Sequence, residues 1–283
     1  MLITIVTPSY NQGGFLEQTI TSVLSQGGGF YLEYLVMDGG STDGSVEIMK
    51  KYDRLLKSGA WPVKCLGVQY KWKSEKDNGQ ADAINKGFRD AKGEIVAWLN
   101  ADDTYLPGAL QRAIGHLSEN PGTMMLYGEG YEIDSSGGVI RRFPATREFD
   151  LDSLIHVCDY ILQPTVFMRK KALDEAGYLD PALHWCLDWD LWIRIGKRFR
   201  VDYIDGYLAN SRVYGETKTS TGGLKRYREI CSVIRRHGSR TLAPGYFVYG
   251  FDLMLYALGR VCPSLYGLMK RIFKPRRAVT GGA

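Results

Sequence analysis

Residues 94–103, EIVAWLNADD, contain the segment that decides the fold. Its first six residues, Glu94–Leu99, form a short run that is mostly apolar and contains β-branched and aromatic side chains. Such a run is typical of a buried strand and is too short for an ordinary helix. It is the most strand-like segment of the chain, and we expect it to lie at the centre of a sheet. It ends abruptly in the polar sequence NADD, residues 100–103.

The segments before this strand alternate between strand and helix patterns. Short apolar runs end at Pro8, at Asp38 and before a polar stretch that starts at Ser74, and each is followed by apolar residues at helical spacing. Alternation of this kind predicts an α/β unit with a parallel sheet over the first 120 residues. The predicted strands are Leu2–Thr7, Tyr34–Met37 and Val63–Val68, and the predicted helices run from Phe15 to Leu24, from Asp43 or Ser45 to about Leu56, through Ile84 and Phe88 to near Gly93, and from Pro107 to about Leu117.

The second half of the chain has a different pattern. Met124–Ile133 and Val139–Phe143 flank the turn DSSGG and predict a hairpin. A strand at Thr165–Met168 and helices at Lys170–Ala176 and Leu187–Lys197 follow. Because no linker separates the halves, we expect residues 1–240 to form one domain and residues 241–283 to be an amphipathic, basic C-terminal extension.

Composition excludes several classes of protein. The chain has 283 residues, of which 45% are hydrophobic and 24% charged, which is typical of a soluble globular protein rather than a disordered one. It has no apolar run of the roughly 20 residues that span a membrane and no signal-peptide pattern at its start, so we expect a cytoplasmic location. Five cysteines and four histidines are dispersed without metal-binding spacing, which disfavours a disulfide framework and a zinc site.

The net charge of +5 is concentrated in the tail. Residues 245–283 carry six Lys or Arg and one Asp, so the rest of the chain is balanced, which disfavours nucleic acid as a partner. Tyr246–Gly259 has the pattern of an amphipathic helix, with Asp252, Tyr256 and Arg260 on a polar stripe. The apolar stretch Leu265–Phe273 and the basic sequence KPRR follow. Together these segments resemble an interfacial anchor on an anionic membrane, and the alternative is packing on the domain or on a second subunit.

Acidic residues follow the predicted strands at the edge of the sheet where ligands bind in open α/β folds. Asp38 follows the second strand, Asp77 and Asp82 follow the third, and Asp102 and Asp103 follow the strand in EIVAWL. Adjacent carboxylates repel one another unless a cation lies beside them. Oxygen ligands suit Mg²⁺ or Mn²⁺, so the pair predicts a metal site, with a helix cap as the alternative.

Taken in order, these motifs resemble the family 2 nucleotide-sugar glycosyltransferases, which have the GT-A fold. That fold is a Rossmann-like α/β architecture whose mixed, mainly parallel sheet is flanked by helices, here with a C-terminal helical extension. The resemblance covers roughly residues 3–220. Its motifs are TPSYN (7–11), LSQ (24–26), MDGGSTD (37–43), SEKDNGQ (74–80) with Asp82–Gly87, LNADD (99–103), QPTVF (163–167) and LDWDLWIR (187–194).

The resemblance implies a donor site for a nucleoside diphosphate sugar. Pro8, Ser9 and Tyr10 would line the nucleotide pocket, Asp38 would accept a hydrogen bond from a pyrimidine base, and Asp77 would hold the base or ribose, which favours UDP or dTDP. Asn100, Ala101 and Asp102 occupy the family's metal-binding DxD motif, with Asn in the first place. The Mn²⁺ or Mg²⁺ ion would therefore rest chiefly on Asp102, with Asp103 assisting.

The resemblance also implies a general base for an inverting transfer. That role falls on Asp188, while Leu187 stands where the family usually has Glu, and Asp190 is the competing candidate. Trp185 is expected to contact a sugar, whereas Trp189 and Trp192 are expected in the core. The family often has a His near residues 212–218, and here Arg212 or Lys218 would meet the diphosphate instead, or residues 216–223 would form a lid.

The predicted function is transfer of a sugar from a nucleoside diphosphate sugar to a hydroxyl group of a glycan or lipid-linked acceptor. A nicotinamide dehydrogenase is excluded because no GxGxxG sequence follows the first strand. A sugar nucleotidyltransferase and a non-catalytic sugar-nucleotide-binding protein remain as alternatives. No motif identifies the sugar or the acceptor.

Overall fold

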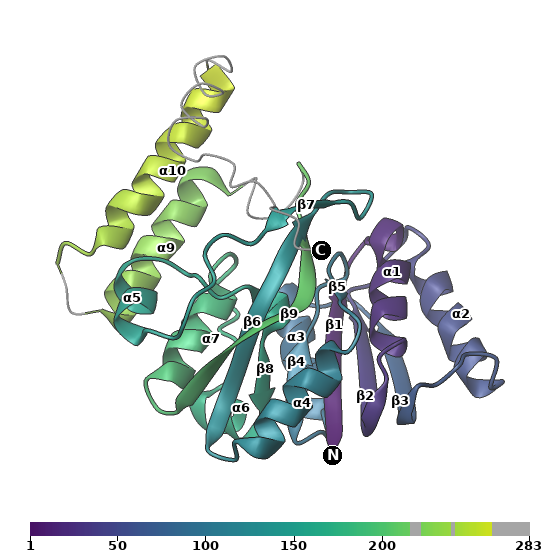
Figure 1. Ribbon diagram of the computed structural model, residues 1–283. Coiled ribbons are helices and arrows are strands. Elements are labelled where there is room, and N and C mark those ends of the chain that lie inside the picture. Colours follow the sequence, from purple (N-terminus) through teal and green to yellow (C-terminus); the bar gives the residue numbers. More distant parts are fainter. Residues whose placement is uncertain (216–221, 239–240, 262–283) are drawn as a thin grey trace.

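A computed structural model describes residues 1–215, 222–238 and 241–261 of the chain, apart from the side chains of residues 256 and 259–261. Helices cover both faces of one large sheet (Figure 1). The elements in chain order are β1 (Leu2–Ser9), α1 (Gly13–Leu24), β2 (Gly28–Asp38), α2 (Ser45–Lys57), β3 (Cys65–Ser74), α3 (Gln80–Asp90), β4 (Ile95–Trp98), β5 (Thr104–Tyr105), α4 (Ala109–Glu119), β6 (Thr123–Ile133), β7 (Val139–Arg142), α5 (Leu151–His156), the 3-10 turn η1 (Gln163–Thr165), β8 (Phe167–Arg169), α6 (Lys170–Ala176), α7 (Leu187–Gly196), β9 (Arg200–Arg212), α9 (Gly223–His237) and α10 (Pro244–Val261).

The sheet has the strand order β3-β2-β1-β4-β8-β6-β9-β5, and β7 pairs with β6. β3, β2, β1 and β4 are mutually parallel, as the alternation of strands and helices predicted. β8 runs antiparallel to both β4 and β6, and β6 and β9 then pair in parallel. The sheet is therefore mixed and mainly parallel, which confirms the predicted fold class.

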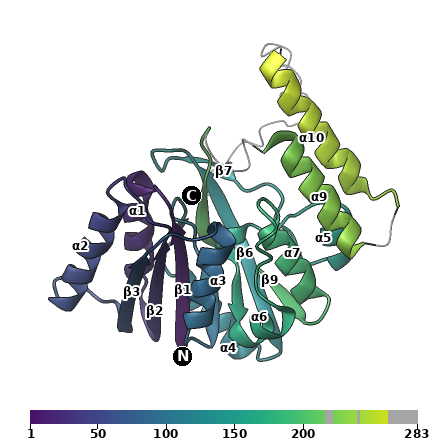
Figure 2. The ribbon, with the colours of Figure 1, turned by 180° about the vertical axis from the view of Figure 1, so that it is seen from behind.

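β4 lies at the centre of the sheet, as predicted from its sequence. Ile95 and Ala97 point into the core beneath α1, α2 and α4, whereas Val96 and Trp98 point into the core shared with α3, α6 and α7. Burial on both faces explains why this strand is apolar throughout, because alternate side chains point to opposite sides. Figure 2 shows the second face, with α3, α6 and α7 over the strands.

The structure corrects several predicted boundaries. The third strand was expected at Val63–Val68, but β3 begins at Cys65 and continues to Ser74, because every residue from Tyr31 to Asp38 of β2 has a partner on it. Thr165, predicted within a strand, lies in η1, and the strand begins at Phe167. Of the dispersed cysteines, Cys186 is buried and those at 65, 158 and 231 are half-buried, and Cys262 lies outside the described residues.

Four elements were not predicted: the two-residue strand β5, α5, β9 and α9. β9, with the sequence RVDYIDGYLANSR, is only partly buried and mixes polar and apolar residues without regular alternation. Its place in the sheet depends on pairing with β6, a strand about 80 residues earlier in the chain. α9 is strongly basic and buries only Ile230, Val233 and Ile234. Both elements depend on distant partners more than on a local pattern.

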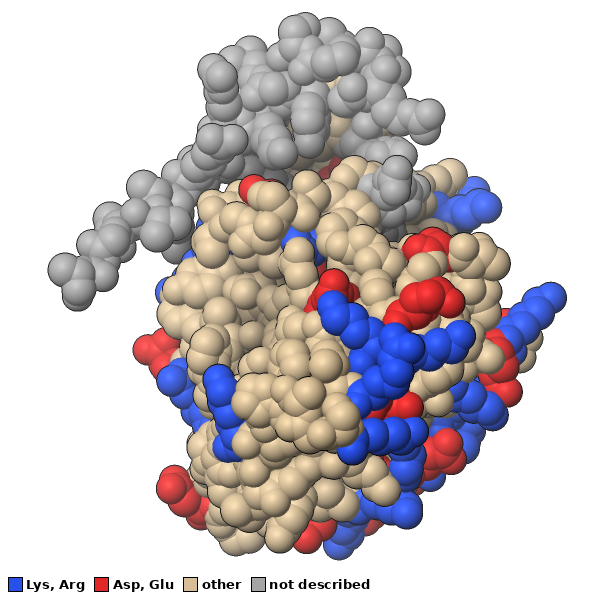
Figure 3. Space-filling view, turned by 90° about the vertical axis from the view of Figure 1, so that its right-hand side faces the viewer, with Lys and Arg blue, Asp and Glu red and all other residues tan. Residues whose placement is uncertain are grey.

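β3 forms one edge of the sheet, on the side of the molecule that also carries α2. Figure 3 shows this side, where basic and acidic side chains are interspersed. Two exposed lysines of β3 belong to this surface: Lys71 pairs with Glu33 and Lys73 pairs with Glu75. Charged side chains on an edge strand hinder pairing with another chain, so the edge is protected from aggregation.

α10 packs along α9 and extends away from the sheet (Figure 1). It confirms the helix predicted at Tyr246–Gly259. Of the predicted polar stripe, Asp252 is half-buried, whereas the side chains of Tyr256 and Arg260 lie outside the described part of the chain. The stretch Leu265–Phe273 and the sequence KPRR also lie outside it. No helix among the described residues is long and apolar enough to cross a membrane.

Candidate active site

A cleft of about 410 Å³ lies between the central strands and the helices α7, α9 and α10. Asn100 and Asp103, from the loop after β4, line it together with Trp185 and Asp188, which lie just before and within the first turn of α7. These residues are about 85 positions apart in the sequence. The fold therefore brings the predicted metal loop and the predicted base into one cleft.

Asn100 is held by amide hydrogen bonds from two other motifs. Its Oδ1 accepts from Gln80 Nε2 at 2.8 Å, and its Nδ2 donates to Gln163 Oε1 at 3.1 Å and to Asp103 Oδ2 at 3.3 Å. Gln163 Nε2 in turn donates to the carbonyl of Trp98 at 2.9 Å. Asn100 therefore fixes the shape of the loop. Gln80 and Gln163 belong to the motifs quoted above, but no role was assigned to them from sequence.

Asp102 and Asp103 differ in exposure and in partners. Asp103 is buried, with 4% of its surface exposed, and accepts a hydrogen bond from the backbone N–H of Arg212 at 2.9 Å. Burial and the neighbouring charge of Asp102 raise the pKa of Asp103 well above its usual range. Asp102 is half-buried, and its Oδ2 accepts from the hydroxyl of Tyr214 at 3.0 Å.

The carboxylates of Asp102 and Asp103 suit a divalent ion that takes only some of its ligands from the protein. A cation beside Asp102 and Asp103 would relieve the repulsion that raises the pKa of Asp103. No group of three or more His, Cys, Asp or Glu side chains in the described ranges is arranged to hold a metal ion. Further oxygen ligands would have to come from water and from a bound diphosphate, which is how Mg²⁺ is commonly held.

Arg212, a candidate for contact with the diphosphate, makes its hydrogen bonds with other groups of the protein. Its residue surface is 3% exposed, and its guanidinium donates to the carbonyls of Asp102, Asp134 and Ser135 and to Gln18 Oε1. It also lies 4.7 Å from the centre of the Phe15 ring. Arg212 thus holds the loop of residues 100–103, the predicted metal site, in position. Lys218, the other candidate, and residues 216–221 of the predicted lid lie outside the described residues.

Asp38 and Asp77, from the predicted nucleotide site, lie together at the carboxyl ends of β2 and β3 and line one small surface hollow. A Cβ atom on Gly39 would lie 2.8 Å from Asp77 Oδ2, so glycine there allows the carboxylate to approach the backbone. Asp38 is 2% exposed and accepts hydrogen bonds from the backbone at Gly40 and Ser41 and from the hydroxyls of Ser41 and Ser74. It organises the loops after both strands.

The other predicted nucleotide residues lie at the end of β1. Pro8 and Ser9 are its last two residues and are buried, and the Ser9 hydroxyl has no hydrogen-bond partner among the described residues. Tyr10 follows with 63% of its surface exposed. Ala101, next to Asn100, is buried. An exposed aromatic ring beyond a buried strand is free to stack on a flat ligand such as a nucleotide base.

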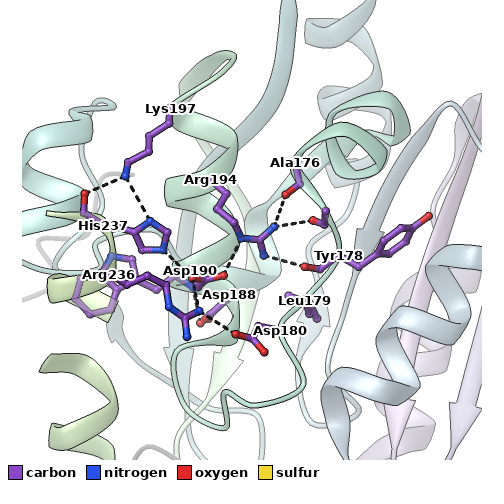
Figure 4. Close-up of polar contacts among 12 residues, drawn as sticks. Ala176, Tyr178, Leu179, Asp180, Asp188, Asp190, Arg194, Lys197, Arg236 and His237 are labelled. Atoms are coloured by element: carbon purple, nitrogen blue, oxygen red, sulfur yellow. Dashed lines mark hydrogen bonds and ion pairs between the residues drawn. The ribbon is translucent and has the colours of Figure 1, made fainter. Parts of the chain in front are cut away.

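Asp188 and Asp190 have different surroundings on α7. Asp188 is half-buried, lines the cleft and accepts from the backbone N–H of Trp189 at 2.8 Å. Asp190 is 1% exposed and accepts from Arg194 Nε at 2.8 Å, from His237 Nε2 at 2.7 Å and from Arg236 at 3.3 Å. Figure 4 shows Asp190 within this group. Asp190 is therefore a structural anchor, and Asp188 is the carboxylate available to the cleft.

The aromatic residues near α7 divide as expected. Trp189 and Trp192 are 2% and 0% exposed and belong to the core, whereas Trp185 is half-buried and lines the cleft. The Trp192 ring stacks on the Trp98 ring at a centroid distance of 5.2 Å. Trp98 belongs to β4, so this stack fixes α7 against the central strand.

Several residues of the site were not identified from sequence, and four of them hold or surround the start of α7. Asp159, Arg226 and Tyr249 line the cleft, and Glu229 accepts hydrogen bonds from the backbone just before α7. Burial and the charge of Asp188 raise the pKa of Asp159 well above its usual range. No motif marks these residues, because they come from a loop and from α9 and α10, which approach α7 only in the folded chain.

The architecture and the cleft define a GT-A glycosyltransferase, a class in which a mainly parallel sheet presents an acidic loop to the donor. The family model described as glycosyl transferase family 2 matches residues 4–176. The chain therefore belongs to glycosyl transferase family 2.

Known proteins of this kind resemble the chain over most of its length. An uncharacterized glycosyltransferase of Rickettsia conorii is 26% identical over 249 residues, which are 82% of this chain and 37% of that protein. The structure of S. aureus TarS 1–349 in complex with UDP-GlcNAc has a TM-score of 0.61 at 16% identity and covers 98% of this chain and 77% of that one. The mannosyltransferase PcManGT of Pyrobaculum calidifontis, in complex with GDP-Man and Mn²⁺, has a TM-score of 0.55 at 13% identity and covers 97% of this chain and 88% of that one. These structural likenesses show the fold.

Proposed function

We propose that the protein transfers a sugar from a nucleoside diphosphate sugar to a hydroxyl group of a glycan or lipid-linked acceptor, with inversion and with a divalent ion. The observation that carries this proposal is that Asn100 and Asp103 line the same cleft as Asp188 and Trp185. The first two residues suit a site for a metal-bound diphosphate, and the last two suit a site for an acceptor hydroxyl. TarS in complex with UDP-GlcNAc and PcManGT in complex with GDP-Man and Mn²⁺ support a nucleotide-sugar donor.

On the donor side, the nucleotide would lie across the ends of β1 and β2. Pro8, Ser9 and Tyr10 would line its pocket, and Asp38 and Asp77 would face the base and ribose. Asp38 already accepts four hydrogen bonds, three of them on Oδ2, so Oδ1 is the atom best placed to accept from a pyrimidine base. A pyrimidine favours UDP or dTDP.

At the metal site, Asp102 would hold Mn²⁺ or Mg²⁺ with help from Asp103, next to Asn100 and Ala101. A bound ion supplies positive charge that stabilises the departing diphosphate. Arg212 and Tyr214 keep the loop and the Asp102 carboxylate in place. The protein's own part is to present preorganised carboxylates, so that little rearrangement is needed when the donor binds.

At the acceptor site, Asp188 would act as the general base. Its carboxylate takes the proton of the acceptor hydroxyl while that oxygen forms a bond to the anomeric carbon. The bond between the anomeric carbon and the diphosphate oxygen breaks on the opposite face, so the configuration inverts and the nucleoside diphosphate leaves. No covalent bond to the protein forms in this mechanism.

We also place the enzyme in the cytoplasm, in peripheral contact with an anionic membrane surface through residues 241–283. Two observations support this: six of the last 24 residues are Lys or Arg, and α10 exposes Phe247 at 66%, Met254 at 47% and Val248 at 43%. Apolar side chains beside basic ones are typical of segments that bind anionic lipid. A lipid-linked acceptor would be available at such a surface.

The test is a donor panel with and without Mn²⁺, using UDP-GlcNAc, UDP-glucose, dTDP-glucose and GDP-mannose. We expect Mn²⁺-dependent release of nucleoside diphosphate from one of them. Asp188→Asn should lower this release at least 100-fold while leaving nucleotide affinity within about twofold, because the base acts on the acceptor oxygen. Asp205→Asn is the matched control, since Asp205 is exposed and makes no hydrogen bond or ion pair with the described residues. Release of pyrophosphate would indicate a nucleotidyltransferase, and binding without any release would indicate a non-catalytic protein.

A further inference from the structure

The helices α9 and α10 contribute directly to the cleft. Arg226 and Ile230 of α9 and Tyr249 of α10 are among its lining residues. Figure 1 shows α9 and α10 side by side as a hairpin that reaches the end of α7. The cleft is thus closed on one side by a part of the chain that follows the matched family region, residues 4–176.

Glu229 of α9 holds the backbone that leads into α7. Its carboxylate accepts from the N–H groups of His184 at 2.9 Å, Trp185 at 2.6 Å and Cys186 at 2.7 Å. The first N–H groups of a helix have no partner within the helix and are usually satisfied by a nearby side chain of the same segment. Here the partner comes from 43 to 45 residues later. The position of Asp188, two residues after Cys186, therefore depends on α9.

Tyr249 of α10 contacts both carboxylate-bearing segments of the cleft. Its hydroxyl oxygen accepts from the backbone N–H of Asp159 at 3.0 Å. Its ring lies 5.8 Å from the ring of Trp189, the residue after Asp188. The Asp159 carboxylate accepts from the N–H of Ile161 at 3.1 Å, so Asp159 is held from two sides. One side chain of α10 thereby sets the position of Asp159 relative to Asp188.

We propose that α9 and α10 build the acceptor side of the catalytic cleft, with Glu229 and Tyr249 as positioning residues that hold Asp188 and Asp159. This inference rests on the proposed role of Asp188 as the base. A base must be held close to the attacking oxygen, because small displacements of reacting groups cost much of the rate. Asp159 is the second carboxyl group beside the acceptor, and the guanidinium of Arg226, 5.9 Å from the Tyr249 ring, is the nearby positive charge.

The experiment compares Glu229→Gln and Tyr249→Phe in the full-length protein. Gln keeps the shape of Glu229 but replaces one accepting oxygen with an NH₂ group, and Phe removes only the hydroxyl of Tyr249. The matched controls are Glu175→Gln on α6 and Tyr246→Phe, one turn earlier on α10. The Tyr246 side chain makes no hydrogen bond with the described part of the chain, although its backbone carbonyl accepts from Tyr227.

Two quantities are measured well below the melting temperature. The first is release of nucleoside diphosphate from the donor that reacts fastest in the panel above, together with the affinity for that nucleoside diphosphate. We expect a five- to tenfold lower kcat in both variants, unchanged nucleotide affinity and no change in the controls. The second is amide hydrogen exchange, which should accelerate at residues 184–190 in Glu229→Gln and around residue 159 in Tyr249→Phe.

The two measurements separate failure of this inference from failure of the proposed function. Unchanged exchange in both variants, or faster exchange with wild-type kcat while Asp188→Asn is inactive, would overturn the role of the hairpin. An equal loss of nucleotide affinity and kcat would also overturn it, because that pattern indicates general destabilisation. Full activity of Asp188→Asn would instead overturn the base, and the exchange data would still report whether the hairpin holds α7.

Discussion

At the scale of single residues, the loop of residues 100–103 differs from the family's acidic motif at its first position. Asn100 stands where the family's motif has its first acid, and its amide group is hydrogen-bonded to Gln80, Asp103 and Gln163. In the proposed metal site the charge for an ion would come from Asp102, whose carboxylate accepts a hydrogen bond from the hydroxyl of Tyr214. Burial, the charge of Asp102 and the hydrogen bond to Asp102 raise the pKa of Tyr214 to about 12. The Tyr214 hydroxyl is therefore protonated at neutral pH and can donate this hydrogen bond.

We expect Asp102→Asn to weaken the Mn²⁺-dependent binding of UDP by about tenfold or more, because it removes the accessible carboxylate of the loop. Tyr214→Phe should weaken the same binding by about threefold, since it removes one hydrogen bond that orients Asp102. Calorimetric titration of UDP with and without Mn²⁺ measures both effects, with Asp205→Asn as the control. A wild-type response to Mn²⁺ in Asp102→Asn would exclude this loop as the metal site.

At the scale of elements, α7 carries two aspartates with different surroundings: Asp188 lines the cleft and Asp190 is paired inside the protein. Residues two apart on a helix point in different directions, so Asp188 faces the cleft while Asp190 faces α9. Burial alone would raise the pKa of Asp190, but the hydrogen bonds from His237 and Arg194 outweigh it and lower the pKa to about 2. Arg194 also donates to the carbonyls of Ala176, Gly177 and Tyr178 (Figure 4). Asp190 therefore joins α7 to α9 and to the end of α6.

We expect Asp190→Asn to lower the free energy of unfolding by about 2 kcal/mol at pH 7 and the melting temperature by about 4 °C, while retaining transferase activity in the folded fraction. Because the folded-state pKa is lower than the unfolded one, this stabilisation is present above about pH 4 and is lost as the pH falls toward 2. Urea unfolding between pH 7 and 2.5 should show the difference between variant and wild type shrinking over that range. A constant difference would mean that the ion pairs of Asp190 are not its cause.

At the scale of the whole molecule, the hairpin of α9 and α10 has an inner and an outer side. Tyr249 and Leu255 of α10 are half-buried and buried against the body, whereas Phe247 and Met254 are exposed. The same helix is therefore suited both to complete the cleft and to meet a surface. The predicted domain boundary near residue 240 stays a prediction, and the packing of α10 on α9 means that the two parts touch across it.

We expect the full-length protein to sediment with liposomes that contain anionic lipid and to do so less at high salt. Each basic residue near such a surface contributes about 1 kcal/mol, so replacing Lys270, Arg271, Lys274, Arg276 and Arg277 with Gln should abolish the salt-sensitive part. Phe247→Ser should reduce the part that persists at high salt. Equal sedimentation of all variants, or no preference for anionic lipid, would favour packing or dimerisation of this segment.

The sequence alone determined the layered α/β fold, because its signals are local. β1, β4 and α1 are recognisable from short apolar runs and helical spacing, and the family motifs cluster at strand ends where ligands bind. The hairpin of β6 and β7 was likewise predicted from its turn residues. The candidate donor residues and Asp188 were assigned by resemblance to a family whose motifs stay together in the sequence.

The tertiary structure decided everything that depends on contacts between distant segments. β9 is a strand because it pairs with β6, and Asp103 and Asn100 have their partners at Arg212 and Gln163, 63 to 109 residues away. The difference in surroundings between Asp188 and Asp190 depends on Arg236 and His237, which contact Asp190 and whose positions no local pattern records. Glu229 and Tyr249 entered the site for the same reason: α9 and α10 reach α7 only after the sheet has folded, because packing energy rather than local propensity fixes their position.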